Sequence, residues 1–138
     1  MAALGVRQGC RALSILIVDD DADAAESLAW ILQADGHDVH VALDGPAALL
    51  SATEFWPDVV FLDLAMPRMD GYRVASLLQE QAGAKPKPLL IAVSGYGADA
   101  DRLQSNAHGF QFHFVKPAEP ALIQALLRVY AERGTQLA

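Results

Sequence analysis

The sequence predicts an α/β domain in which a parallel β-sheet is covered by helices on both faces. Five short apolar runs rich in β-branched residues alternate with segments whose apolar residues recur at helical spacing. The runs are continuous rather than alternating, which is typical of strands buried on both faces. Repeated strand–helix units with short connections favour parallel strands joined by right-handed crossovers.

The predicted strands are residues 14–18, 39–42, 59–62, 89–93 and 112–115. The helical faces between and after them include Ala24, Leu28, Ile31 and Leu32; Ala47, Leu49 and Leu50; Val74, Leu77 and Leu78; and Leu122, Ile123, Leu126, Leu127 and Tyr130. Asp23, with Glu26 three residues later, predicts the start of the first helix, and Gly36 its end. Asp21 and Asp23 are both interpreted as N-caps of that helix. We expect Trp30 and Trp56 to pack against apolar surface. The domain is expected to span residues 14–133, between an extension over 1–13 and a tail over 134–138.

Composition restricts the class of protein. The chain has 138 residues, 53% of them hydrophobic, with a net charge of -7 and a single cysteine, Cys10. The lone cysteine excludes an internal disulfide and favours the reducing cytoplasm. The acidic balance, without any cluster of Lys and Arg, argues against direct binding of nucleic acid. No apolar run reaches the roughly 18–20 residues of a membrane span, and the run before Asp19 lacks a signal-peptide cleavage site.

Polar residues follow four of the predicted strands. They are Asp19, Asp20 and Asp21 after the first, Asp63 after the third, Ser94 and Gly95 after the fourth, and Lys116 after the fifth. Parallel strands bring such residues to one edge of the sheet, where ligands of open α/β sheets bind. Clustered carboxylates repel one another, and Mg²⁺ is the cation that best matches such oxygen ligands. The sequence therefore predicts a magnesium site there.

The same arrangement suits phosphoryl transfer. The Asp63 carboxylate could attack a phosphorus atom while Mg²⁺ and Lys116 neutralise the phosphoryl oxygens and Ser94 donates a hydrogen bond. The product would be an aspartyl phosphate at Asp63.

Four segments resemble the receiver domains of two-component response regulators. They are ILIVDDD at 15–21, PDVVFLDLAMPRMDG at 57–71, IAVSGYG at 91–97 and FVKP at 114–117, in the family's order and spacing. The resemblance covers about residues 14–133. It implies a flavodoxin-like (βα)5 three-layer fold whose five parallel strands have the order 2-1-3-4-5.

The resemblance also implies a role for each site residue. Asp63 would be the phosphoacceptor, Asp19 and Asp20 would hold Mg²⁺ with Asp63 and the backbone carbonyl of Ala65, Ser94 would be the switch hydroxyl, and Lys116 would bind phosphate and precede a cis Pro117. His113 departs from the family, which usually has Tyr or Phe there as the switch residue. If the His113 ring moves inward on activation, its neutral form should be favoured.

The implied function is signalling rather than metabolic catalysis. A sensor histidine kinase or a histidine phosphotransfer protein would supply the phosphoryl group, and the domain would catalyse its own phosphorylation. The surface of the fourth helix, fifth strand and fifth helix, residues 98–133, would then bind a downstream protein. We expect no output domain after residue 138. A stand-alone regulator and a receiver from a hybrid kinase both stay open, as do the kinase, stimulus, phosphoryl lifetime, own dephosphorylation and oligomeric state.

Rival hypotheses fit the residues less well. A haloacid-dehalogenase-type phosphohydrolase would need a second Asp where the chain has Ala65, and its other metal carboxylates come late in the chain. An interaction module that no longer accepts phosphate would not need the full set of site residues found here. A calcium loop starting at Asp19 fails, because Ala24 and Trp30 stand where Gly and Glu are required. The GxGxxA pattern at 95–100 is followed by too little chain for a dinucleotide-binding half.

Overall fold

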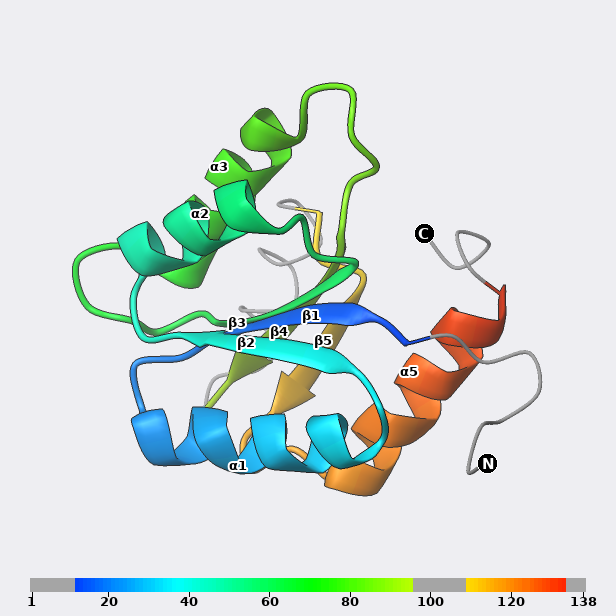
Figure 1. Ribbon diagram of the computed structural model, residues 1–138. Helices are drawn as coiled ribbons and strands as arrows, with labels where there is room; N and C mark the ends of the chain where they lie inside the picture. The colour runs from blue at the N-terminus through cyan, green and yellow to red at the C-terminus, as the bar shows by residue number, and fades with distance from the viewer. Residues whose placement is uncertain (1–11, 96–108, 134–138) are drawn as a thin grey trace.

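The computed structural model describes residues 12–95 and 109–133 (Figure 1). The strands of this part are β1 (Ser14–Val18), β2 (Asp38–Ala42), β3 (Val59–Asp63), β4 (Leu89–Ser94) and β5 (Phe112–Val115). The helices are α1 (Ala22–Ala34), α2 (Gly45–Glu54), α3 (Gly71–Ala82) and α5 (Pro120–Arg133). The helix expected between β4 and β5 falls in residues 96–108, outside the described residues. None of the described helices is long and apolar enough to cross a membrane.

The five strands form one parallel sheet in the order β2-β1-β3-β4-β5. Helices α2 and α3 cover one face, and α1 and α5 cover the other (Figure 1). The predicted α/β class and the strand order implied by the resemblance are both confirmed. Because every strand runs in the same direction, the carboxyl ends of β1, β3, β4 and β5 meet at one edge of the sheet.

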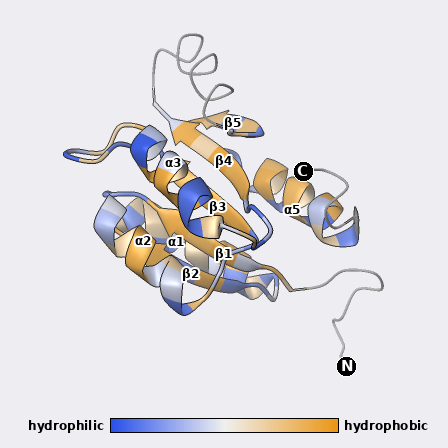
Figure 2. Ribbon diagram, turned by 90° about the horizontal axis from the view of Figure 1, so that it is seen from above, coloured by the Kyte–Doolittle hydropathy of each residue, from blue (hydrophilic) through white to orange (hydrophobic). Residues whose placement is uncertain are grey.

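Successive residues of each strand supply the two halves of the core. On β3, Val59 and Phe61 pack in the layer of α1 and α5, whereas Val60 and Leu62 pack in the layer of α2 and α3. This explains the continuous apolar runs, since neither face of a central strand meets water. In Figure 2, β3 and β4 are coloured almost wholly as hydrophobic, whereas the helices carry both colours.

Aspartates begin three of the helices. The Asp21 carboxylate accepts hydrogen bonds from the backbone amides of Asp23 and Ala24, and Asp44 and Asp70 cap α2 and α3 in the same way. Of the two aspartates predicted to be N-caps, Asp21 is confirmed as the cap of α1 and Asp23 was wrong. Asp21 has the extended backbone of an N-cap. Asp23 lies in the first turn, where its negative charge interacts favourably with the helix dipole. Gly36, in the left-handed conformation just after α1, ends it as predicted.

Five residues expected to contact apolar surface are exposed instead, and these predictions were wrong: Ala24, Trp30, Ala47, Leu50 and Leu122, the last of which is 59% exposed on α5. Leu50 is 66% exposed, because α2 turns its small residues Gly45, Ala48 and Ala52 to the core and so approaches the sheet closely. Trp30 is 79% exposed on α1. Trp56 is partly buried and packs as expected against the buried core of the α2–α3 layer.

Gly71 brings α3 directly against the strand that carries Asp63. A Cβ atom at this position would lie 2.6 Å from the Asp63 carbonyl oxygen and 3.0 Å from the Leu64 Cα. Both neighbours are backbone atoms of a central strand and its exit, so they have little freedom to move. Glycine is required here for close approach of the helix, not for an unusual backbone angle.

We predict that Gly71→Ala lowers the free energy of unfolding by about 1–3 kcal/mol, the cost of overpacking a rigid contact. Urea unfolding would measure it. Gly95→Ala is the control, because a Cβ at Gly95 meets nothing within 4 Å. Equal stability of the two variants would show that α3 can move away from β3 without cost.

Candidate functional site

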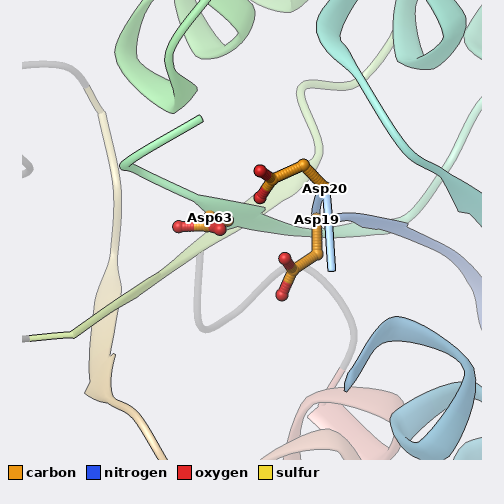
Figure 3. Close-up of side chains that lie close together, drawn as sticks. All are labelled: Asp19, Asp20 and Asp63. Carbon is orange, nitrogen blue, oxygen red and sulfur yellow. The ribbon is translucent and has the colours of Figure 1, made fainter. Parts of the chain in front are cut away.

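Three carboxylates meet at the carboxyl edge of the sheet. Asp19 and Asp20 directly follow β1, and Asp63 is the last residue of the neighbouring strand β3. One oxygen of each carboxylate lies within 4.8 Å of one oxygen of each of the others. The structure therefore brings together the three acidic residues that the sequence predicted as metal ligands (Figure 3).

The three side chains differ in direction and burial. Asp19 and Asp63 are 7% and 6% exposed, whereas Asp20 is exposed. In Figure 3, Asp19 points toward the side of α1 and α5 and Asp20 toward the side of α2 and α3. Two backbone amides fix the buried pair: Asp21 donates to Asp19 Oδ1 over 2.9 Å, and Ala65 donates to Asp63 Oδ1 over 3.0 Å.

Lys116 links the two buried carboxylates. Its Nζ lies 3.0 Å from Asp19 Oδ2 and 3.2 Å from Asp63 Oδ2. The Lys116 backbone amide donates to the Ser94 carbonyl over 2.6 Å, which anchors this residue beside the end of β4. The peptide bond between Lys116 and Pro117 is cis, as the resemblance implied.

Burial and charge set the protonation of this group. Burial raises the pKa of Asp19, and the nearby Asp63 charge adds to that effect, although hydrogen bonds from the Asp21 amide and Lys116 partly oppose it. For Lys116, burial alone would lower the pKa, but the hydrogen bond with Asp19 and the charges of Asp63 and Asp19 outweigh burial and raise it. Lys116 is therefore charged at neutral pH. The surroundings of Asp19 compensate only part of the cost of burying its negative charge.

The donor set fits a divalent cation. Three carboxylates and one ammonium leave a formal charge of -2, which one Mg²⁺ would cancel. Hard oxygen ligands from two or three carboxylates match the preference of Mg²⁺, which keeps several waters. The exposed Asp20 leaves room for those waters. The backbone carbonyl of Ala65 as a further ligand stays a prediction.

Ser94 is buried at the end of β4, and its hydroxyl makes a contact that the sequence analysis missed. Ser94 Oγ lies 2.7 Å from Nε2 of His113 on β5. The sheet register explains this, since Ala92 pairs with His113 and Ser94 projects from the same face two residues later. Knowledge of the register, rather than any residue pattern, would have revealed it. The usual Phe at this position could not make this bond.

We predict that Asp19→Asn raises the thermal unfolding midpoint of the metal-free protein at neutral pH. The folded-state pKa of Asp19 lies above its ordinary value of 3.8, so its protonation stabilises the fold and its ionisation does the opposite. The gain should shrink as the pH falls through the raised pKa, because the wild-type carboxyl then becomes neutral too. Added Mg²⁺ should reverse the order of the two proteins.

Glu26→Gln is the control, because Glu26 is an exposed charge on α1 whose removal should leave the midpoint nearly unchanged. A lower midpoint for Asp19→Asn at neutral pH without metal would contradict the assigned effect of burial.

Comparison with known proteins gives the same family as the motifs. The family model for the response regulator receiver domain matches residues 15–128. The transcriptional regulatory protein PrrA of Mycobacterium tuberculosis is 40% identical over 118 residues, which cover 83% of this chain and 49% of PrrA. The DNA-binding response regulator MtrA of the same organism is 33% identical over 120 residues, or 87% of this chain and 51% of MtrA.

The fold comparison agrees. The Vibrio cholerae chemotaxis protein CheY4 matches with a TM-score of 0.77 and 28% identity, over 86% of this chain and 99% of that protein. The chain spans about half the length of the curated relatives it matches. The resemblance seen in the sequence motifs is thus confirmed, and the chain belongs to the receiver domains of two-component response regulators.

Proposed function

We propose that Asp63 accepts a phosphoryl group from a phosphohistidine on a sensor kinase or phosphotransfer protein, with Mg²⁺ held by Asp19, Asp20 and Asp63. Phosphorylation on an aspartate is the function of the family to which the chain belongs. The observation that carries the proposal is the contact of Lys116 Nζ with both buried carboxylates of the three-carboxylate cluster. The site thereby offers a nucleophile and positive charge side by side.

The transfer balances without a further reactant. An Asp63 oxygen attacks the phosphorus and the P–N bond to the donor's imidazole breaks. The imidazole leaves neutral when its other ring nitrogen is protonated before the transfer, because the electron pair of the P–N bond then stays on the nitrogen that held the phosphorus. Lys116 stays charged and can turn from the carboxylate to the phosphoryl oxygens, since its ammonium carries three donors. Bound Mg²⁺ would supply the remaining positive charge.

Geometry alone supports Asp63 and Asp19 nearly equally as the phosphoacceptor. Both are buried, both accept one backbone amide, and both contact Lys116. The sequence distinguishes them, because Asp63 lies in the segment PDVVFLDLAMPRMDG and Asp19 begins the acidic pair that the family uses for metal. The test must therefore locate the phosphate and not only detect it.

The downstream partner is proposed to be a protein that binds the surface including β5 and α5. The Ser94 hydroxyl on β4 is hydrogen bonded to His113 on β5. A phosphoryl group that forms a hydrogen bond with this hydroxyl instead would release His113. This surface would then change with phosphorylation. The chain is acidic, and we propose no direct contact with nucleic acid; DNA binding is a property named for MtrA, half of which this chain does not match.

We predict that Mg²⁺ and acetyl phosphate add one phosphoryl group to the protein, as seen by intact-mass spectrometry. Borohydride reduction and peptide mapping should place it on Asp63. Asp63→Asn should not be labelled, and chelation of Mg²⁺ should abolish labelling of the wild type. Asp70→Asn is the control, since Asp70 is an exposed helix cap.

Label on Asp19, or equal labelling of Asp63→Asn, would refute the assignment. Steady turnover of p-nitrophenyl phosphate would favour the phosphohydrolase alternative instead.

We predict that Ser94→Ala and Lys116→Ala fold but no longer transmit the modified state. Loss of the hydrogen bond between the Ser94 hydroxyl and His113 should change stability by about 1 kcal/mol. Beryllofluoride, which stands in for the phosphoryl group, should shift NMR signals of β5 and α5 in the wild type and much less in either variant. Ser76→Ala on α3 is the control. A wild-type response from both variants would show that Ser94 and Lys116 do not serve the switch.

A further inference from the structure

A cavity of about 460 Å³ lies beneath α1, next to the carboxylate cluster. Its walls come from α1, from the sheet, and from the segment that joins β5 to α5. The lining residues are apolar except Asp19, Ser27, Asp63 and Lys116. This volume is within the range of about 300–1,000 Å³ found for small-molecule sites.

The cavity follows from the small side chains around it. Ala24 and Ala25 on α1 and Ala118 after β5 line it, and larger residues at these positions would fill the space. Leu28, Ile31 and Ile123 form part of the apolar wall. Contact with an apolar group would remove this apolar wall from water, which is favourable. The body of a fitting ligand is therefore hydrophobic.

The polar end of the cavity selects the charge of the ligand. Asp19 points to this side of the sheet (Figure 3), and two carboxylates and one ammonium leave a net charge of -1 there. Lys116 already donates to both carboxylates, so an anionic head group would meet two negative charges. Each carboxylate oxygen can accept a further hydrogen bond beyond those described. A cationic head group that donates hydrogen bonds fits this end.

We propose that the cavity binds small amphiphilic monocations, with the apolar body beneath α1 and the cationic head on Asp19 and Asp63. This inference rests on the proposed function in one respect only: because the same carboxylates would hold Mg²⁺, the amine and the metal exclude one another. Occupation of the cavity would then suppress phosphorylation of Asp63.

Binding of phenylpropylamine to the metal-free protein tests the site directly by NMR titration. The amine should shift the methyl signals of Leu28, Ile31 and Ile123. Phenylpropanol lacks the charge and propylamine lacks the ring, and each should bind at least about tenfold more weakly. Equal binding of phenylpropanol would overturn the role of the carboxylates, and equal binding of propylamine would overturn the role of the apolar cavity.

Ala24→Leu places a larger side chain in the cavity and should weaken binding of phenylpropylamine by about tenfold or more. Ala47→Leu is the matched control, because both alanines are exposed third residues of helices whose amides are capped by an aspartate. Neither residue belongs to the phosphoacceptor site, so both variants should keep Mg²⁺ binding. Unchanged affinity for the amine in Ala24→Leu would refute the location.

Competition with Mg²⁺ separates this inference from the proposed function. Saturating Mg²⁺ should weaken amine binding by about tenfold or more, as expected for mutually exclusive ligands. Amine binding that Mg²⁺ leaves unchanged would refute the exclusion. A protein that binds the amine but neither Mg²⁺ nor a phosphoryl group would refute the proposed function and support amine binding in the cavity. A protein that binds Mg²⁺ and accepts a phosphoryl group but does not bind the amine would refute only the proposed amine site.

Discussion

Repulsion among Asp19, Asp20 and Asp63 is the constraint on which the rest of the site depends. Two of these carboxylates are nearly buried, where unpaired charge is costly. Lys116 offsets part of that charge, and two backbone amides offset more. The remaining negative charge is what a bound cation would offset. The fold tolerates this local cost because its apolar core lies on both faces of the sheet behind it.

The parallel sheet makes such a concentration of charge possible. Buried strands need no polar residue along their length, so polar residues gather where each strand ends. The close approach of α3 at Gly71 and the aspartate cap of α1 hold the exits of β3 and β1 in fixed positions. The positions of the carboxylates therefore depend on contacts made by residues outside the three-carboxylate cluster.

The sequence predicts the strands well, because continuous apolar runs of β-branched residues have few other interpretations. It also predicts Asp19, Asp63 and Lys116 as a group, since parallel topology alone brings strand ends together. It failed for Leu50, Leu122 and Trp30, because apolar character does not tell which face of a helix approaches the sheet. It failed for Asp23, because three neighbouring aspartates offer the same capping chemistry and only the backbone selects Asp21.

The contact between Ser94 and His113 and the cavity beneath α1 could not be predicted from the sequence for another reason. The bond from Ser94 to His113 depends on the register of β4 against β5, and one residue of slip would remove it. The cavity beneath α1 likewise depends on the distance between α1 and the start of α5. No local pattern encodes that distance.

The contacts of Lys116 have a consequence for the maturation of the chain. Lys116 is separated from Asp63 by 53 positions and from Asp19 by 97 positions, and it reaches them only when β5 has joined the sheet. Contacts between such distant positions form late, because the intervening chain must first be ordered. During synthesis, a nascent chain that lacks β5 has the acidic residues but not their ammonium partner. The complete cluster of three carboxylates and one ammonium therefore forms only after almost the entire domain has left the ribosome and folded.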